Sequence, residues 1–564
     1  MSAMTDVPTA RDLHAPADMV RWYAPVQLLR TAARVAVSTV LGDQLDRRIL
    51  RPTPAHELTD FSHRDQLVLD FVSDSGDGWN PTYAVAYWAT RPILRVQGPH
   101  GRAYELPRAS VLVFGGDQVY PTPSRAAYEQ RLVLPYECAF ERSQPPHPVL
   151  FAVPGNHDWY DSLATFTKLF LDKQWFCGWQ IHQRASYFAA RLPHDWWLVG
   201  VDVQLGSDID AHQVEYFRAL AERMGPGAKI ILCTAEPHWV RAHEQRDRRA
   251  RARRVRDGNL AFLERLFGQR IRVFLSGDLH HYRRHATADG RVQKITAGGG
   301  GAFLHPTHVL HDDPLTGGYG LRCAFPDPVT SRRLAWHNLA FPLRNPTFGA
   351  VTGLLYLLIG WNMRAALGGP PAVEFVPALS DMLCATLRSP WAALWLLVTA
   401  GALVWFADAR RPHLRLLAGL SHTAAHALAV LALAWLGGQL GRALALEWNS
   451  PGELGLGLGL LLGLGWVVSA AIFGVYLLVA VNLFRRHGNE AFSSLRIQDF
   501  KHFLRLHIRR DGALVIYPIA LRRVPRRWRT MIGADPGEPK LVPDDPHPDT
   551  RPGLIEAPIV LGPG

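Results

Sequence analysis

Four long apolar stretches in the second half of the chain constrain its fold more than any other feature. They cover residues 348–367, 391–407, 416–436 and 454–484. A helix needs about 20 predominantly apolar residues to cross a bilayer. The first stretch is interrupted near its end by Asn362 and Arg364 and the second is short, whereas the last two contain no Asp, Glu, Lys or Arg. The sequence therefore predicts a multi-pass integral membrane protein with about four transmembrane helices.

The basic residues between these stretches predict their orientation. Arginines cluster at positions 410–415, between the second and third stretches, and at 485–486, after the fourth. Cytoplasmic loops carry an excess of Lys and Arg, so both clusters are expected in the cytoplasm. An even number of spans then places the N-terminal part of the chain on the cytoplasmic side as well. The five scattered cysteines, which form no CxxC pair, also favour a reducing compartment.

Residues 63–325 have a different pattern, in which short apolar runs alternate with Gly- and Asp-rich turns and with helical segments. This alternation is typical of an α/β domain. The runs that we expect to form strands are 66–72, 111–114, 149–153, 196–203, 229–234 and 271–275.

The sequence PGNHD at positions 154–158 directly follows one of these expected strands. Catalytic groups in open α/β sheets often lie at the carboxyl ends of strands. A simple turn would need the Pro, Gly and Asn of this segment, but not the adjacent His157 and Asp158. On its own the segment is as consistent with a turn as with a functional site, so its neighbours decide between the two.

Other turns also place metal-ligand residue types directly after expected strands. These residues are Asp74, Asp77, Asp117, His238, Asp278 and His280. A single Asp in a turn indicates little, because Asp builds turns and caps helices, and a lone His is most often a core residue. Carboxylates, the Asn156 amide and imidazoles at five strand ends are together the ligand types of a metal site.

In their order these segments resemble the motifs of the calcineurin-like metallophosphoesterase superfamily, whose signature is D-x-H, GD, GNH[DE], an isolated His and GHxH. Asp117 in its GD pair, the GNHD segment at 155–158 and His238 match in the right order. Two positions depart from the signature, because Gly76 replaces the His of D-x-H and Asp278 replaces the first His of GHxH. The resemblance covers roughly residues 65–310 and implies a metallophosphoesterase-like β-sandwich flanked by helices.

The resemblance also implies a reaction centre. It implies two divalent metal ions, held by the ligands Asp74 or Asp77, Asp117, Asn156, His238, Asp278 and His280. Asp117 would bridge the two ions, and His157 would protonate the leaving oxygen while Asp158 orients its ring. Replacing imidazoles by carboxylates makes the ligand set harder, which favours Mn over Fe or Zn.

Four regions follow from these patterns. We expect an N-terminal lead and helix at 1–60, a metallophosphoesterase domain at 61–340, a four-helix transmembrane region at 346–486, and a cytoplasmic tail at 487–564. Within the tail, two apolar runs around Arg509-Arg510-Asp511-Gly512 predict a hairpin, and hence a small C-terminal β module with a disordered end.

Charge and small-residue patterns suggest partners. The net charge of +12 suits an anionic membrane surface better than nucleic acid, which we do not expect to bind. The arginine-rich segment 241–256 is consistent with either a solvated helix or contact with anionic headgroups. Glycines at 455, 459 and 463 suggest close helix packing, which could support an oligomer formed through the transmembrane helices.

These features lead to three hypotheses. The first is a metal-dependent phosphoesterase that hydrolyses a phosphomonoester or phosphodiester at the cytoplasmic membrane face by attack of a metal-activated water, with membrane lipids as partners. The second is a membrane signalling or scaffold protein with a degenerate metallophosphoesterase fold, which the departures at Gly76 and Asp278 motivate. The third is transport through the helical region, supported only by the i, i+4 pair His422 and His426.

Overall fold

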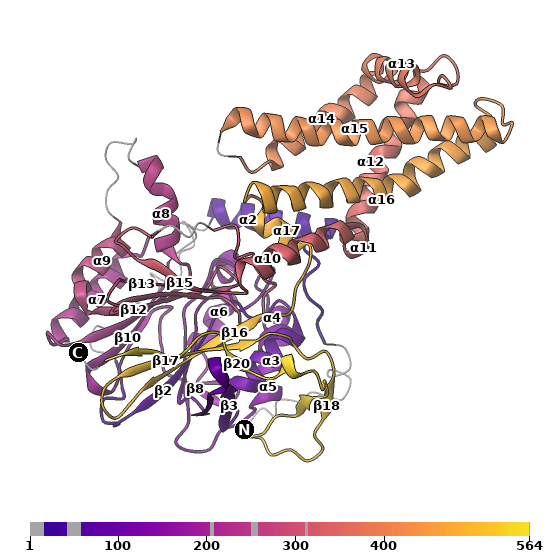
Figure 1. The fold of residues 1–564 in the computed structure, drawn as a ribbon. Coiled ribbons are helices and arrows are strands. Elements are labelled where there is room, and N and C mark those ends of the chain that lie inside the picture. Colours follow the sequence, from indigo (N-terminus) through magenta and orange to yellow (C-terminus); the bar gives the residue numbers. More distant parts are fainter. Residues whose placement is uncertain are drawn as a thin grey trace.

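The computed structural model describes residues 16–41, 58–203, 208–249, 258–310, 314–409 and 411–562. It has two parts, a domain built on two large β-sheets and a bundle of long helices that projects from one side of it (Figure 1). The chain leaves the domain after α11 (Phe341–Arg344) and returns to it at α17 (Gly488–Ser493).

The larger sheet has eleven strands, and its centre is formed by three parallel strands that each precede a candidate site residue. In spatial order the strands are β4 (Ala103–Pro107), β3 (Ile93–Gln97), β20 (Gly553–Leu554), β17 (Leu514–Leu521), β16 (Lys501–Ile508), β2 (Leu67–Val72), β5 (Val111–Phe114), β6 (Val149–Ala152), β8 (Trp179–Ile181) and β7 (Trp175–Phe176), with β21 (Ile559–Leu561) also paired to β17.

The second sheet has eight strands, and its parallel centre supplies the remaining candidate residues. Its order is β1 (Thr59–Asp60), β9 (Phe188–Arg191), β10 (Trp196–Val201), β11 (Lys229–Thr234), β12 (Ile271–Ser276), β14 (Gln293–Ala297), β13 (Tyr282–Ala286) and β15 (Gly320–Phe325). A separate short pair joins β18 (Trp528–Thr530) and β19 (Leu541–Pro543).

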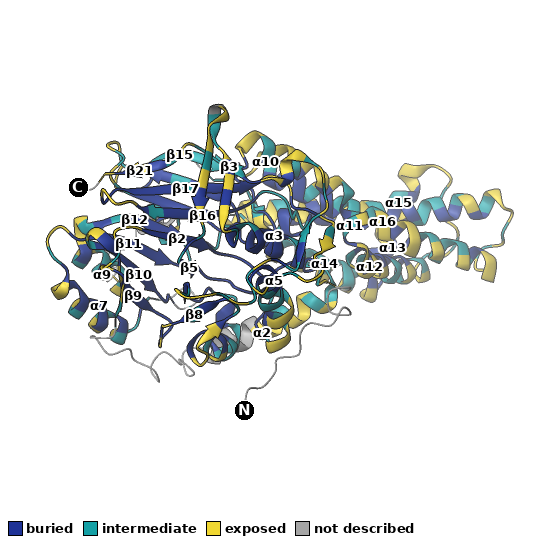
Figure 2. Cartoon of the chain, turned by 90° about the horizontal axis from the view of Figure 1, so that it is seen from below, coloured by how far each residue is buried: buried dark blue, intermediate teal, exposed yellow. Residues whose placement is uncertain are grey.

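The two sheets pack face to face around a shared apolar core, and both are buried along most of their length (Figure 2). Phe71 and Phe151 of the larger sheet lie in the same buried cluster as Leu198, Ile231 and Val273 of the smaller one. Helices cover the outer faces. They include α3 (Trp79–Ala89) and α5 (Leu134–Ala139) on the larger sheet, and α7 (Ala211–Arg223) and α9 (Asn259–Phe267) on the smaller one. The prediction of a mixed α/β domain with large sheets is confirmed.

The prediction of a separate C-terminal β module is wrong. The hairpin β16–β17 forms as expected, but β16 pairs along β2 and so belongs to the larger sheet. Arg505 on β16 is fully buried and donates two hydrogen bonds to Asp70 on β2, at 2.8 and 2.7 Å. The segment predicted to be disordered also contributes β20 and β21 to this sheet. The helical region is therefore an insertion within the β-sheet domain.

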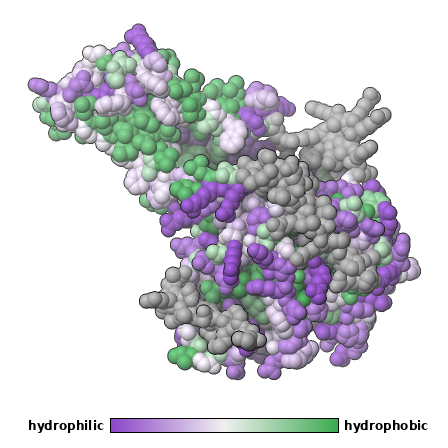
Figure 3. Space-filling view, turned by 180° about the vertical axis from the view of Figure 1, so that it is seen from behind, coloured by the Kyte–Doolittle hydropathy of each residue, from purple (hydrophilic) through white to green (hydrophobic). Residues whose placement is uncertain are grey.

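The helical region consists of α12 (Pro346–Ala365), α13 (Phe375–Arg388), α14 (Pro390–Phe406), α15 (Pro412–Ala443) and α16 (Pro451–Leu483). Among the described residues, only α15 and α16 are long and apolar enough to cross a membrane, and α13 and α14 could form a third, broken span because they meet at 94°. The predicted count of four spans is thus reduced to two or three. The helix at 348–367 forms, but Arg364 within it pairs with Glu453. Hydrophobic side chains gather over this projecting part (Figure 3).

The N-terminal region connects the two parts of the molecule. The helix expected within residues 1–60 forms as α2 (Pro25–Leu41), and residues 42–57 lie outside the described part. Tyr23 packs edge to face on Phe348 of α12 and on Phe473 of α16. Residues 241–249 of the arginine-rich segment lie in α8 (His238–Arg249), and residues 250–257 lie outside the described part.

Candidate functional site

Three aspartates meet at the carboxyl ends of strands from both sheets. Asp74 follows β2, Asp117 follows β5 and Asp278 follows β12. All three have a left-handed backbone, with φ of 59°, 51° and 65°. This conformation costs a non-Gly residue about 1–2 kcal/mol, and such outliers concentrate at functional sites. The shared distortion marks these strand ends as one structural unit.

Two glycines allow the strand ends to approach one another. A Cβ at Gly155 would collide with the Asp117 carboxylate, and a Cβ at Gly277 would collide with Ser73 and with the Asp74 carboxylate. The glycines of the GNHD and GDLH segments are therefore required for close contact with these carboxylates, beyond any role in turning the chain.

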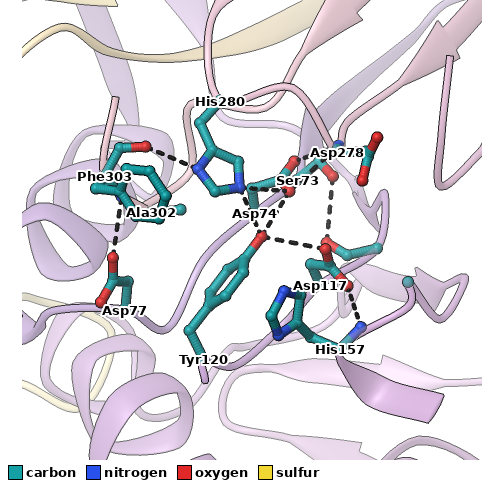
Figure 4. Close-up of polar contacts among 12 residues, drawn as sticks. Ser73, Asp74, Asp77, Asp117, Tyr120, His157, Asp278, His280, Ala302 and Phe303 are labelled. Carbon is teal, nitrogen blue, oxygen red and sulfur yellow. Dashed lines mark hydrogen bonds and ion pairs between the residues drawn. The ribbon is translucent and has the colours of Figure 1, made fainter. Parts of the chain in front are cut away.

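The hydroxyl of Tyr120 lies at the point where three of the candidate ligands converge (Figure 4). Its oxygen is 2.8 Å from Oδ1 of Asp74, 3.2 Å from Oδ2 of Asp117 and 2.9 Å from Nε2 of His280. The ring of His280 is fixed from its other side, because Nδ1 donates to the carbonyl oxygen of Phe303 at 2.7 Å.

This arrangement has more acceptors than protons. A carbonyl can only accept, so the neutral ring of His280 carries its proton on Nδ1 and presents a lone pair at Nε2. Two carboxylate oxygens and this nitrogen thus share a hydroxyl that has one proton to donate. Tyr120 itself is buried, as are Asp74, Asp117 and His280. Oxygen and nitrogen lone pairs directed at one buried point also match the donor set of a divalent cation.

The spacing around the hydroxyl is wider than a metal shell. In the described part of the chain, no group of three or more His, Cys, Asp or Glu side chains has the geometry to hold a metal ion. Asp74, Asp117 and His280 are side chains of the metal-ligand type, and the Tyr120 hydroxyl lies between them.

Burial and mutual repulsion perturb the site carboxyls. Burial raises the pKa of Asp74 to about 7, in spite of the hydrogen bond from Tyr120. Burial, and then the charges of Asp74, Asp158 and Asp278, raise the pKa of Asp117 well above its ordinary value. A neighbouring cation would relieve this repulsion.

His157 lies beside the converging ligands, as expected, but its ring has a different partner from the one predicted. Its backbone N–H donates to Oδ1 of Asp117 at 2.8 Å, and its Nδ1 donates to the carbonyl of Pro121 at 2.8 Å. Burial lowers the pKa of its imidazole to about 4. The ring is neutral at pH 7, with Nε2 as the nitrogen that remains for chemistry.

The prediction that Asp158 orients this ring is wrong. The carboxylate of Asp158 accepts hydrogen bonds from the hydroxyl of Tyr128 and from the backbone N–H groups of Gly155, at 2.9 Å, and Gln118, at 3.3 Å. It is fully buried and holds the loops after β5 and β6 together. The sequence could not distinguish a carboxylate that bonds the neighbouring ring from one that bonds the loop backbone.

Asp77, the predicted alternative to Asp74, lies away from the converging ligands (Figure 4). Its Oδ1 accepts from the backbone N–H of Val20 at 2.8 Å, and its Oδ2 accepts from that of Phe303 at 3.0 Å. Because both oxygens bond to backbone groups, Asp77 fastens the N-terminal segment to the domain, and Asp74 is the carboxylate that contacts Tyr120.

The predicted ligands of the second ion do not converge on one point, because each contacts a different neighbouring side chain. Nε2 of His238 contacts the carboxylate of Glu264 on α9, and its ring packs on Trp239 and Phe274. The Asp278 carboxylate faces the guanidinium of Arg241 at 3.4 Å. Asn156 donates to the hydroxyl of Tyr160 at 3.3 Å.

Sequence reasoning missed three residues at the site. Tyr120 follows Asp117 by three positions, so its place in the same loop was a usable signal. Trp22 packs edge to face on the rings of His157 and Phe303. Lys501 is fully buried and donates to the carbonyl of Ala302. No local pattern connects Trp22 or Lys501 to the site, because they come from opposite ends of the chain.

Comparisons with known proteins yield only distant similarities. No family model and no curated protein matches the chain. A solved structure described as GAP50, the anchor in the inner membrane complex of Plasmodium, aligns over 43% of this chain and 74% of its own at 13% identity, with a TM-score of 0.29. A structure of PhoD aligns over 45% of this chain and 59% of its own at 9% identity, with a TM-score of 0.26. These similarities are too weak to assign this chain to a family.

Proposed function

We propose that the chain is a metal-dependent phosphoesterase that hydrolyses a phosphomonoester or phosphodiester at the membrane surface. One observation carries the proposal: Asp74, Asp117 and His280 direct three lone pairs at a single buried hydroxyl that has one proton. Buried carboxylates without enough donors are costly unless a cation or added protons neutralise them. The order of the motifs along the chain supports the same assignment.

In this proposal the residues have separate tasks. Asp74, Asp117 and His280 would hold the cation, with Asn156 and Asp278 at the edge of the site. A bound divalent cation would supply an activated water and neutralise charge on the phosphoryl oxygens. His157 would accept a proton from the attacking water at Nε2, which carries the lone pair of the neutral ring, and would then donate that proton to the leaving oxygen; its Nδ1 is held by Pro121. The harder ligand set favours Mn, with Fe or Zn as alternatives.

The proposal extends to location. The apolar helices α15 and α16 would anchor the domain, and the arginines at 411–415 and 485–486 would place it on the cytoplasmic side. A second ion held by Asn156, His238 and Asp278 would require both the His238–Glu264 and the Arg241–Asp278 pairs to open. Binding of one ion is therefore expected first.

The decisive experiment measures metal content by plasma mass spectrometry after supplementation with Mn. We expect about one ion per chain in the wild type and a loss of tenfold or more in Asp117→Asn, because the variant removes a charge at the centre of the ligand set. Asp77→Asn is the matched control, since Asp77 is equally buried but bonds only to backbone groups. Metal-free wild-type protein, or equal loss in both variants, would contradict the proposal.

A second function, a binding or scaffold protein without catalysis, is favoured by one specific observation. Every charged group of the predicted second ion site has a protein partner, as in the Arg241–Asp278 and His238–Glu264 pairs. If the wild type binds no metal and hydrolyses neither p-nitrophenyl phosphate nor its bis ester, this function replaces the first.

A further inference from the structure

A cavity of about 360 Å³ lies at the junction between the domain and the helical bundle. Its lining includes three arginines, Arg21, Arg30 and Arg131, and a single acidic residue, Asp18. The volume falls within the range of about 300–1,000 Å³ that is typical of small-ligand sites. Such an excess of guanidinium groups favours a bound anion, and guanidinium matches phosphate in particular.

The arginines of the cavity differ in how firmly their side chains are held. Arg131 is fixed, because its Nη1 donates to the carbonyl oxygens of Asp18, at 3.0 Å, and of Asp77. Arg21 is largely exposed and lies 3.9 Å from the exposed Asp18 carboxylate, so this contact opposes an incoming anion only weakly. One side of the cavity is thus rigid, and the other can close on a ligand.

The position of the cavity points to the membrane surface. Tyr23, next to the lining residue Ala24, packs against Phe348 and Phe473 at the base of the bundle. The helix α2 lies beside that base (Figure 1). Its side chains Val26 and Leu29 are 60% and 73% exposed, close to the basic lining. Apolar side chains beside arginines at the end of apolar helices are typical of the headgroup layer.

We propose that this cavity binds the phosphate-bearing headgroup of an anionic membrane lipid. The three arginines supply positive charge and guanidinium groups whose geometry matches a phosphate group. The exposed apolar side chains of α2 and the neighbouring helical bundle indicate that this phosphate belongs to a lipid. The inference does not depend on the proposed phosphoesterase activity, since it requires neither a metal ion nor hydrolysis.

The same cavity adjoins the candidate site. Pro121 lines it, and the carbonyl of Pro121 accepts the hydrogen bond from Nδ1 of His157. Val20 also lines it, and its N–H bonds to Asp77. A bound headgroup therefore contacts the segments that position His157 and that fasten the N-terminal segment to the domain.

The test uses the full chain in nonionic detergent and measures lipid adducts by native mass spectrometry. The probes are short-chain phosphatidylglycerol, its phosphatidylcholine counterpart and inorganic phosphate. We expect phosphatidylglycerol to bind the wild type, and the double variant Arg21→Gln/Arg30→Gln to bind it about tenfold more weakly, since each basic residue near an anionic surface contributes. The matched control Arg510→Gln/Arg529→Gln removes the same charge from exposed positions of the domain and should bind as the wild type does.

Three outcomes would overturn the inference. Equal phosphatidylglycerol binding by the wild type and the double variant would show that the cavity is not the site. Equal binding of phosphatidylcholine would show that the negative charge is not recognised. Displacement of the lipid by inorganic phosphate at equal concentration would assign the cavity to a soluble anion. The single variant Arg30→Gln, at an exposed position, provides a second test in case the double variant misfolds. It should weaken phosphatidylglycerol binding in the same direction, but less.

Discussion

The two halves of the candidate site solve the problem of buried charge in opposite ways. In the converging half, Asp74, Asp117 and His280 surround the Tyr120 hydroxyl, and acceptors outnumber protons. In the paired half, His238 lies against the Glu264 carboxylate and Asp278 faces the Arg241 guanidinium. A cation entering the converging half competes with a single hydroxyl proton, whereas in the paired half it must displace Glu264 and Arg241.

This difference shows that a residue of the metal-ligand type can already be bonded to another side chain. Both halves contain residues of the metal-ligand type, and both matched the expected order along the chain. Only in the converging half are the lone pairs left without enough donors. The balance of donors and acceptors therefore distinguishes the two halves, which residue types alone leave alike.

The largest expected effect tests whether the converging half supports catalysis. His157→Ala should lower the hydrolysis of p-nitrophenyl phosphate by about 10²–10⁴-fold, the usual contribution of a general acid or base. Metal content should stay at the wild-type value, because only the backbone N–H of His157 contacts Asp117. Unchanged hydrolysis in this variant would place any activity outside the converging half.

Removing the hydroxyl at the convergence point should produce a smaller but specific effect. Tyr120→Phe removes the side-chain hydrogen bond to Asp74 and leaves the bond from the backbone N–H of Asp278, so the metal-free protein should lose about 1–3 kcal/mol in its free energy of unfolding. Added Mn should restore this loss, as measured by thermal unfolding. Tyr128→Phe is the matched control, since its buried hydroxyl bonds Asp158. If Mn rescues both variants equally, the hydroxyl does not compete with a cation.

Opening the paired half should make the two halves more alike. Glu264→Gln removes the charge beside His238 and should cost about 1 kcal/mol of stability, since the pair is only partly exposed. It should also allow a second ion to bind, which metal content per chain would reveal. Glu222→Gln, on the exposed side of α7, is the control. An unchanged metal content in Glu264→Gln would show that His238 cannot act as a ligand.

The smallest effect is expected for Arg241→Gln. The Arg241 side chain is 47% exposed, so losing its ion pair with Asp278 should change the free energy of unfolding by no more than about 1 kcal/mol. Mn should nevertheless bind more tightly, because a positive charge near the ligands has been removed; calorimetric titration would measure this. Weaker Mn binding would mean that Arg241 positions Asp278 for the ion.

Much of the fold could be predicted from local patterns. The apolar runs before Asp74, Asp117 and Asp278 became buried strands because each was short, β-branched and followed by a turn. The C-terminal hairpin was also predicted, but its partner was not. The pairing of β16 with β2 depends on Asp70 and Arg505, which lie on opposite sides of the helical region in sequence. Local periodicity contains no information about such distant pairing.

The residues of the candidate site could also be predicted in part from the sequence. Residue types and their order put Asp74 or Asp77, Asp117, His157 and His280 in one predicted site, together with Asn156, Asp158, His238 and Asp278. Within this group, Asp77 and Asp158 have the same chemistry as the other aspartates and a similar sequence position, yet their oxygens bond to backbone groups or to Tyr128. A one-dimensional pattern cannot show which way a carboxylate points.

The sequence by itself determined the α/β domain, the apolar helical region and the strand-end positions of the polar residues. These depend on composition and periodicity, which act over a few residues at a time. Only the tertiary structure decided that the C-terminal strands complete the larger sheet, that Tyr120 lies between three acceptors, and that His238 pairs with Glu264. Hydrogen bonds and ion pairs act over a few ångströms, so their partners are fixed only when distant segments have packed together.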